Sequence, residues 1–309
     1  MRVKIFIVLC SLIVALSARG QQWAQSNVSA LCLRSAASHG SEMETQAFCG
    51  MPLRVDSVAG DWARVSTPDG VDCYAPLKSI VLRDSAEMAA WRKSPRLIAT
   101  SLRPELIVGD TLAPDGGAIV SDVTLCSIFE GEKSPGSVFA EVRLPDGRRG
   151  YIRSEAVEDL DEWSRREPSA DRIIDAARSM MGTPYLWGGT TSKATDCSGF
   201  TQLSFFYSGI MIPRNSRGQA AFCGAAEPDM TGFERGDLLF FGEGDGERIT
   251  HVGIYSGATR FLHSSGMVRE NSFDPEDPWY IPRRVLCAGR VDLQDPSLKV
   301  ANHPWYFER

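Results

Sequence analysis

The sequence predicts an α+β protein in which the first half uses one β unit twice and the second half places helices before an antiparallel sheet. Two observations lead to this prediction. Residues 62–80 match residues 139–157 at a constant offset of 77 positions, and the hydrophobic spacing changes from strand-like to helix-like after Pro168. The length of 309 residues agrees with two or three domains.

The repeated segment has the pattern of a β-hairpin. An alternating strand leads into Pro-Asp-Gly, in which proline fixes φ and glycine accepts a positive φ, and a second strand carries a tyrosine. The aligned positions are Trp62 and Phe139, Val65 and Val142, the turns 68–70 and 145–147, and Tyr74 and Tyr151. Two unrelated hairpins are the alternative interpretation. Residues 84–94 are expected to form a short linking helix.

Helical spacing begins after a charged linker at residues 159–168. Ser169 is a suitable N-cap, and apolar residues recur at helical spacing until Gly182 ends the helix. A second helix is predicted from Cys197 to Gly209. Strands are predicted at four later places, which are residues 238–241, 249–255, 260–265 and 284–291.

The N-terminus has the order of a secretory signal. Arg2 and Lys4 precede an apolar run at residues 5–16, which is too short to span a bilayer, and small residues follow. Cleavage is expected after Ala18-x-Gly20 or Ala15-x-Ser17, and an uncleaved anchor is the alternative. We therefore expect an exported protein, periplasmic or extracellular, with no stable membrane insertion once the signal is removed.

Composition excludes several classes of protein. The net charge of -6 gives no basis for binding nucleic acid. The eight cysteines contain no C-x-x-C pair and there are only four histidines, so a zinc finger or ribbon is excluded, and no metal or other cofactor is implied. The cysteine spacing shows no disulfide framework, so mostly free, buried thiols are expected. We expect a monomer, although the sequence does not determine the oligomeric state.

Cys197, His251 and His263 are the residues to which we assign the chemistry. Cys197 stands where a loop becomes a helix, and the helix dipole there favours the nucleophilic thiolate. A cysteine nucleophile needs a base, and His251 and His263 are predicted on strands of this half. If Tyr255 pairs with Thr259, His251 falls opposite His263, so His251 can act as base and then acid while His263 orients it. Sequence alone does not set this register.

Residues 170–291 resemble the NlpC-type cell-wall cysteine peptidases. Six motifs follow the family's order: G-T-P-Y-L-W-G-G at 182–189, D-C-S-G-F at 196–200, P-R-N-S-R-G-Q at 213–219, G-D-L-L-F-F at 236–241, H-V-G-I-Y at 251–255 and F-L-H-S-S at 261–265. The resemblance implies a papain-like fold with Cys197 as nucleophile, His251 as base and His263 as orienting residue. It also implies that the Tyr185 hydroxyl lies near the oxyanion, with helix-start N–H groups completing its binding site.

The repeated hairpins resemble those of bacterial SH3-like domains, which are small β-barrels. The domain order also resembles the γ-D-glutamyl-L-diamino-acid endopeptidases, a subfamily also called dipeptidyl-peptidase VI. That resemblance implies a cysteine peptidase that takes peptidoglycan stem peptides with a free N-terminal L-Ala and releases L-Ala-γ-D-Glu. The expected division is a signal at 1–20, SH3-like domains at 27–82 and 96–160, a papain-like peptidase domain at 169–291 and a C-terminal tail at 292–309.

Five residues are expected to bind the substrate. In the subfamily the first SH3-like domain closes one end of the cleft and reads the free amine, and the run at 41–46 resembles the stretch that supplies its acid, which identifies Glu42. Tyr74 resembles the tyrosine of that domain, and Asp196, Ser198 and Ser216 match positions around the nucleophile. Asp196 is also placed to balance a buried ammonium group. A solvated charge at Glu42 and a core aromatic at Tyr74 remain alternatives.

Other functions and roles stay open at this point. The enzyme could instead cut intact murein, transfer its acyl group to an amine, or be an inactive wall-binding protein. The third residue of the stem peptide could be meso-diaminopimelate or L-lysine. Arg214 could contact a substrate carboxylate or brace a loop, and Trp187 is expected in core packing. Cys73 stands where the second repeat has Gly150, which leaves the backbone near Tyr74 unsettled.

Overall fold

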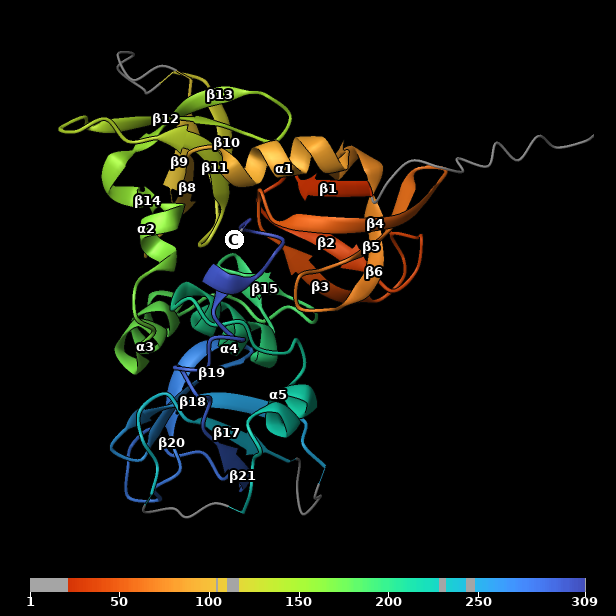
Figure 1. The fold of residues 1–309 in the computed structure, drawn as a ribbon. Coiled ribbons are helices and arrows are strands. Elements are labelled where there is room, and N and C mark those ends of the chain that lie inside the picture. The colour runs from red at the N-terminus through yellow and green to blue at the C-terminus, as the bar shows by residue number, and fades with distance from the viewer. Residues whose placement is uncertain (1–21, 104, 110–116, 228–231, 243–247, 309) are drawn as a thin grey trace, which may run out of the picture.

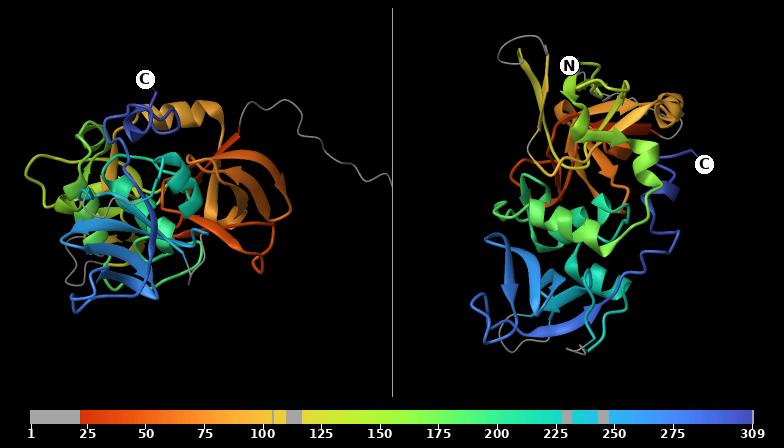
Figure 2. Two further views of the ribbon diagram at one scale, coloured as in Figure 1. Left: turned by 90° about the horizontal axis from the view of Figure 1, so that it is seen from below. Right: turned by 90° about the vertical axis from the view of Figure 1, so that its left-hand side faces the viewer.

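The structure is a computed structural model that describes residues 22–103, 105–109, 117–227, 232–242 and 248–308. The predicted signal at 1–20 lies outside the described residues. Two β-barrels lie side by side at one end of the molecule and a separate sheet lies at the other, with α4 between them (Figures 1 and 2). Within the described ranges, no helix combines the length and apolar character that a membrane crossing requires.

The first barrel, residues 22–83, is a seven-stranded antiparallel sheet with the order β3-β2-β6-β5-β4-β1-β7. Its strands are β1 Gln22–Ser26, β2 Leu31–Arg34, β3 Met43–Ala47, β4 Pro52–Ala59, β5 Trp62–Ser66, β6 Asp72–Pro76 and β7 Ile80–Arg83, with the 3-10 turn η1 Leu77–Ser79 before β7. The sheet thus begins at Gln22, ahead of the expected domain start at residue 27, because β1 pairs with both β4 and β7.

The second barrel, residues 96–159, has the corresponding order β10-β9-β13-β12-β11-β8-β14. Its strands are β8 Arg96–Ala99, β9 Glu105–Val108, β10 Ile119–Val123, β11 Ile128–Glu132, β12 Phe139–Arg143, β13 Arg149–Arg153 and β14 Val157–Asp159, with η2 Ser154–Ala156 before β14. Strands β5 and β6 match β12 and β13 at the sequence offset of 77 positions. Two unrelated hairpins are therefore excluded, and both barrels are SH3-like.

The two barrels differ at one position of the repeated hairpin. Cys73 is buried in the apolar core of the first barrel, where its side chain is accommodated on β6. The equivalent Gly150 has no room for a side chain, because a Cβ atom there would lie 2.4 Å from the Ile107 Cγ2 atom. Cys73 therefore causes no break in β6, and Tyr74 continues the strand opposite Arg64.

Three longer helices and a five-stranded sheet make up the papain-like part. The helices are α3 Ala170–Ser179, α4 Cys197–Tyr207 and α5 Ser216–Phe222, and a short hairpin of β15 Thr190–Thr191 and β16 Ala194–Thr195 precedes α4. The sheet has the order β20-β19-β18-β17-β21, with strands β17 Leu238–Phe241, β18 His251–Gly257, β19 Arg260–Ser265, β20 Met267–Ser272 and β21 Val285–Gly289. Sequence analysis missed β20 and α5.

Strand alternation gives this sheet two different faces. One face packs on the helices and carries Leu238, Phe240, Val252, Ile254 and Leu262. The opposite face carries a smaller cluster of Leu239, Phe241, Phe261 and Val285. Helix α3 begins as predicted, since the Ser169 side chain accepts a hydrogen bond from Arg172 N.

The remaining segments connect the barrels to the papain-like part. Helix α1 Ser85–Lys93 links the two barrels, with a capping box at Asp84, and α2 Leu160–Ser164 follows the second barrel. The C-terminal residues 292–308 run back toward the barrels (Figure 1) and include η3 Val300–Asn302. Tyr306 is buried, and its carbonyl oxygen accepts a hydrogen bond from Arg96 Nη1 at 2.6 Å. This terminal segment is thus part of the core between the domains.

Candidate active site

Cys197 is the first residue of α4, at the point where the helix meets the sheet. The preceding residue caps the helix, since Asp196 Oδ1 accepts a hydrogen bond from Gly199 N at 2.7 Å. Backbone N–H groups of Ser198 and of Val252, the neighbour of His251, donate to the Cys197 thiol. Two elements distant in sequence, the start of α4 and the start of β18, therefore meet at the sulfur atom.

The electrostatic environment keeps the Cys197 thiol protonated in the free protein. Burial raises the pKa of the thiol to about 11, and the nearby carboxylate of Asp196 raises it further. The two backbone N–H groups act in the opposite direction but are outweighed. The helix start therefore favours the thiolate, as expected, but burial outweighs this effect in the free protein, and a base must remove the proton as the sulfur reacts.

His251 and His263 lie on the same face of neighbouring strands, although not in the predicted register. Ile254 pairs with Leu262 and Tyr255 with Phe261, so the strands are shifted by two residues from the pairing of Tyr255 with Thr259. A bulge after Tyr255 and a two-residue turn at Ala258 and Thr259, both with positive φ, cause the shift. Because side chains alternate, a shift of two keeps both histidines on one face as diagonal neighbours.

Hydrogen bonds from Asn271 through His263 to His251 determine the tautomer of each histidine. Asn271 Nδ2 donates to the Trp279 carbonyl oxygen at 2.8 Å, so Asn271 Oδ1 is the acceptor facing His263 Nε2 at 2.9 Å. His263 Nε2 then carries hydrogen and His263 Nδ1 accepts from His251 Nε2 at 2.7 Å. This leaves the lone pair on His251 Nδ1, which is the arrangement a general base requires.

Both histidines are neutral in this arrangement. Burial holds the pKa of His251 well below its usual range, and the neighbouring His263 and Arg283 act in the same direction. Burial also lowers the pKa of His263 to about 4, although the hydrogen bond to Asn271 opposes this shift. Asn271 was missed by sequence analysis because it lies on β20, which was not predicted. Its sequence, Met-Val-Arg-Glu-Asn-Ser at 267–272, has no alternation of apolar and polar residues that would have predicted a strand.

Tyr185 lies on the loop that precedes the nucleophile. Its backbone is held by a hydrogen bond from Tyr185 N to the Gly266 carbonyl oxygen at 2.9 Å. Burial raises the pKa of its hydroxyl to about 12, and Cys197 and Asp196 raise it further, so the hydroxyl stays protonated near both groups. A protonated hydroxyl at this position can donate to a developing oxyanion.

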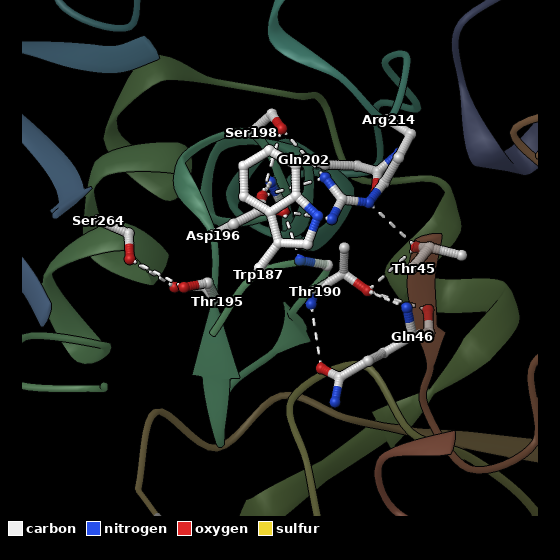
Figure 3. A network of polar contacts seen from close by, with 12 residues as sticks. Thr45, Gln46, Trp187, Thr190, Thr195, Asp196, Ser198, Gln202, Arg214 and Ser264 are labelled. Carbon is white, nitrogen blue, oxygen red and sulfur yellow. Dashed lines mark hydrogen bonds and ion pairs between the residues drawn. The ribbon is translucent and has the colours of Figure 1, made fainter. Parts of the chain in front are cut away.

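Asp196 and Arg214 form a buried ion pair at the centre of a polar network (Figure 3). Asp196 Oδ1 accepts from Arg214 Nη1 at 3.1 Å and from Ser198 Oγ at 3.2 Å. Asp196 Oδ2 accepts from Gly188 N at 2.9 Å and from Arg214 Nη2. With the N-cap bond these contacts occupy the acceptor positions of the carboxylate. Arg214 thus braces this site, and its charge balances that of Asp196 in the free protein.

The same network reaches the first barrel. Arg214 Nε donates to Thr45 Oγ1 on β3 at 3.2 Å. On the adjacent residue, Gln46 Oε1 accepts from Thr190 N at 3.1 Å, and Gln46 N donates to Thr190 Oγ1 at 3.1 Å. Figure 3 shows Thr45 and Gln46 on the side of the network opposite Ser264. Strand β3 is thereby held against the hairpin that leads to the nucleophile.

Glu42 also lies against the loop before the nucleophile. Its Oε1 atom accepts a hydrogen bond from Trp187 Nε1 at 2.7 Å. Trp187 is 63% exposed, so the prediction that it packs in the core is wrong. This exposed indole and exposed carboxylate lie at the surface where the first barrel meets the papain-like part.

The other expected site residues lie at different distances from this network. Ser198 belongs to it, because its hydroxyl accepts from Arg214 Nη1 at 3.0 Å. Ser216 is the half-buried first residue of α5, two positions after Arg214. Tyr74 is half-buried on β6 opposite Arg64 and Arg34, and among the described contacts it has no hydrogen bond to the network.

Neither a metal cluster nor a disulfide is found among the residues that the structure describes. No group of three or more His, Cys, Asp or Glu side chains there could hold a metal ion. The seven cysteines in the described ranges are free, and Cys49, Cys73, Cys126 and Cys197 are buried. A buried thiol at a helix start, a neutral imidazole held by His263 and Asn271, and a protonated tyrosine hydroxyl are together suited to acyl transfer from a carbonyl substrate.

Known proteins share both parts of the chain. Residues 182–288 match the NlpC/P60 family, and residues 33–80 match the bacterial dipeptidyl-peptidase Sh3 domain. A gamma-D-glutamyl-L-lysine dipeptidyl-peptidase of Bacillus cereus is 27% identical over 255 residues, covering 79% of this chain and 74% of the relative. A dipeptidyl-peptidase 6 of Lysinibacillus sphaericus is 25% identical over 254 residues, covering 77% and 87%.

A solved structure has the same fold. The crystal structure of an NlpC/P60 family protein from Bacillus cereus superposes with a TM-score of 0.70 and 23% identity, covering 87% of this chain and 99% of that chain. The match therefore extends over the barrels as well as the papain-like part.

Proposed function

We propose that this cysteine peptidase hydrolyses the γ-D-glutamyl-diamino acid bond of peptidoglycan stem peptides. The premise is the match of residues 182–288 to the NlpC/P60 family and of residues 33–80 to the bacterial dipeptidyl-peptidase SH3 domain. The substrate carries a free N-terminal L-Ala, and the product is L-Ala-γ-D-Glu. The observation that carries this proposal is the placement of Glu42, from the first barrel, against Trp187 on the loop before Cys197. An acid at that end of the cleft suits a substrate with a free ammonium group.

The reaction follows from the order of the groups. His251 Nδ1 takes the proton of Cys197, and the sulfur attacks the γ-carbonyl carbon of D-Glu. The electron pair of the carbonyl moves to oxygen, where the Tyr185 hydroxyl and N–H groups at the start of α4 donate to it. His251 then gives its proton to the leaving amine as the C–N bond breaks. Water activated by the same histidine hydrolyses the thioester and restores the thiol.

His263 and Asn271 act through His251 in this scheme. Their hydrogen bonds hold the lone pair of His251 on Nδ1, and they stabilise the imidazolium that forms when the proton is taken. Because the resting thiol and imidazole are both neutral, proton transfer accompanies attack. No metal or cofactor takes part in any of these steps.

The proposed roles of the remaining residues follow from their positions. Glu42 accepts hydrogen bonds from the substrate ammonium group, with Tyr74 as a further residue of the same barrel. Asp196 and Ser198 shape the site through the Arg214 network, and Ser216 lies at the edge of the cleft at the start of α5. We keep the division into barrels at 27–82 and 96–160 and a peptidase domain at 169–291 as part of this proposal, with β1 added to the first barrel.

Export is part of the same proposal. The order of basic, apolar and small residues at 1–20 supports a cleaved signal. We therefore place the mature protein in the periplasm or outside the cell, as a monomer that acts on peptidoglycan-derived peptides.

The test is product analysis with a nucleophile variant. Wild-type protein and Cys197→Ala are incubated with the tripeptide L-Ala-γ-D-Glu-diaminopimelate, and the products are identified by mass spectrometry. We expect L-Ala-γ-D-Glu from the wild type and none from Cys197→Ala, which should unfold at the same temperature within a few degrees. Release of the dipeptide by the Cys197→Ala variant would contradict the assignment of the nucleophile.

A further inference from the structure

The segment between β20 and β21 crosses the face of the sheet that carries the histidines. Ile281 N donates to the Ser272 carbonyl oxygen on β20 at 3.0 Å, and Val285 pairs with Phe241 on β17. Since the sheet order is β20-β19-β18-β17-β21, residues 282–284 must pass over β19 and β18. Ile281 packs on the cluster that includes Phe241 and Phe261, so the crossing runs over the same face as His251 and His263.

Arg283 lies in the middle of this crossing and has an unsatisfied guanidinium group. The side chain is half-buried, and its Nη1 atom is buried with no hydrogen-bond partner among the described residues. Its positive charge also lowers the pKa of both His251 and His263, which places it within electrostatic range of both rings. A buried cationic donor without an acceptor is costly, so such a group points to an acceptor that the ligand supplies.

A second arginine offers a comparison. Arg269 lies on β20 directly opposite His263, and its buried Nε atom also lacks a partner among the described residues. Its charge lowers the pKa of His263. Arg269 stands on the outer strand of the sheet, with β19 between it and the strand that carries His251. Of the two, Arg283 is therefore the one that reaches the base that protonates the leaving group.

The order of groups in the cleft decides which part of the substrate faces Arg283. Glu42 and Trp187 lie on the side of the first barrel, where the proposed function puts the ammonium group and the acyl part. His251 gives its proton to the leaving amine, so the leaving residue must lie over the histidines. The cleft is thus acidic toward the acyl part and basic toward the leaving residue.

We propose that Arg283 binds a carboxylate of the residue on the leaving side of the scissile bond. The assignment rests on the proposed function, which supplies the orientation of the substrate. Two carboxylates could be bound in this way: the side-chain carboxylate of a diaminopimelate, or the α-carboxylate at the free C-terminus of a tripeptide. A guanidinium group suits either one, because its planar donors match the two oxygens.

The test uses four tripeptides that begin L-Ala-γ-D-Glu. The third residue is diaminopimelate or L-lysine, each with its α-carboxylate free or converted to the amide, and kcat/KM is measured for wild type and Arg283→Gln. We expect the variant to lose about 10- to 100-fold on peptides that carry the bound carboxylate. The peptide with lysine amide has no carboxylate on the leaving side and should change less than about threefold, because its remaining carboxylate, the α-carboxylate of D-Glu, lies on the acyl side of the scissile bond.

The pattern of loss identifies the carboxylate. If Arg283→Gln loses activity on both diaminopimelate peptides and on neither lysine peptide, Arg283 binds the side-chain carboxylate. If it loses activity on both peptides with a free C-terminus and on neither amide, Arg283 binds the α-carboxylate. Arg269→Gln is the matched control: it removes a charge near His263 and should alter all four peptides equally. If Arg283→Gln fails to fold, Arg283→Lys is the substitute. It keeps the positive charge but not the paired guanidinium donors, so it should lose less kcat/KM on the same peptides.

Two other results separate failure of this inference from failure of the proposed function. An equal loss on all four peptides, or no loss on any, would overturn the role of Arg283 while leaving the peptidase intact. If wild type cleaved none of the four peptides, the proposed function itself would fail, and the role of Arg283 would fall with it.

Discussion

The two barrels share a strand order and a hairpin, yet their Pro-Asp-Gly turns contact different parts of the molecule. In the first barrel, Asp69 accepts a hydrogen bond from Gln202 on the catalytic helix α4 at 2.8 Å. In the second barrel, Asp146 accepts from Asn27 of the first barrel at 2.9 Å. The turn of the first barrel is thus joined to the papain-like part, whereas the turn of the second barrel is joined to the first barrel.

This difference shows how one fold serves two purposes. Strand β3 of the first barrel supplies Thr45 and Gln46 to the network around Asp196, and Glu42 immediately before it contacts Trp187. The second barrel contacts the same loop region through an exposed ion pair between Lys193 and Asp122. We infer that the first barrel determines substrate choice and that the second fixes its position. Substitutions in the two barrels should therefore affect activity very differently.

The largest effect is expected at Arg214. Arg214→Met would leave the buried carboxylate of Asp196 without its partner, which costs about 3 to 5 kcal/mol. We expect a matching loss in the free energy of unfolding, measured by urea denaturation, and a loss of activity. Arg143→Met in the second barrel is the matched control, because its pair with Glu130 is partly exposed and should contribute less than about 1 kcal/mol. Equal effects of the two substitutions would contradict the view that the network joining the first barrel to Asp196 matters more than an ion pair within the second barrel.

The next effect is expected at Glu42 and concerns binding. Glu42→Gln removes the charge proposed to hold the substrate ammonium, so kcat/KM for a tripeptide with a free amine should fall about 10- to 100-fold. Glu44→Gln changes an exposed acid two positions later, on β3, and serves as control. Steady-state kinetics with both variants measures the difference. The role of Glu42 would be contradicted if the two variants lost activity to the same small extent.

A third test measures how the free energy of unfolding depends on pH, because the two buried histidines lie in the papain-like sheet and not in the barrels. His251 and His263 are buried and neutral when folded, with lowered pKa values, whereas the unfolded chain takes up protons below about pH 6.5. The stabilisation that the two neutral histidines contribute is therefore fully present above that pH. It is lost as the pH falls toward about 4, the pKa of folded His263. From pH 7.5 to 5.5 we expect a loss of about 1 to 3 kcal/mol in urea denaturation.

His263→Asn should lose less stability over the same pH range, because one titrating group is removed. His39 of the first barrel is exposed, but burial also lowers the pKa of His303 in the C-terminal segment, so the difference between wild type and His263→Asn isolates the share of the papain-like sheet. An unchanged pH dependence in His263→Asn would contradict this account of the buried histidines.

The smallest effect is expected at the contact between the barrels. Asn27→Ala removes the hydrogen bonds with Asp146, which lie at the surface, and should cost no more than about 1 kcal/mol. Activity should remain within about twofold of wild type, since the first barrel keeps its contacts with α4. A large loss of activity in Asn27→Ala would mean that the second barrel controls the active site directly.

The features that could be predicted from the sequence are those that depend on a local pattern of residues. The repeat at an offset of 77, the N-cap at Ser169 and the helix that starts at Cys197 are all local signals, and each is present in the structure. The shared face of His251 and His263 was also predictable, because alternation along a strand survives a shift of two residues.

The parts that could not be predicted depend on contacts between distant segments. The partner of Asp196 is Arg214, the partner of Glu42 is Trp187, and His263 is held by Asn271 from a strand with no strong signal. The protonation state of Cys197 also depends on how deeply the surrounding segments bury it. None of these can be derived from spacing along the chain, because each is set by tertiary packing.

The central claim is that the first barrel reads a free amine, and one comparison tests it most directly. Wild-type protein is given L-Ala-γ-D-Glu-diaminopimelate and the same peptide with its N-terminus acetylated, and the rates of dipeptide release are measured by mass spectrometry. We predict rapid release from the free peptide and a rate lower by about 100-fold or more for the acetylated one, since acetylation removes the charge that Glu42 would balance. Equal rates on the two peptides would contradict the claim and identify an enzyme that cuts intact murein.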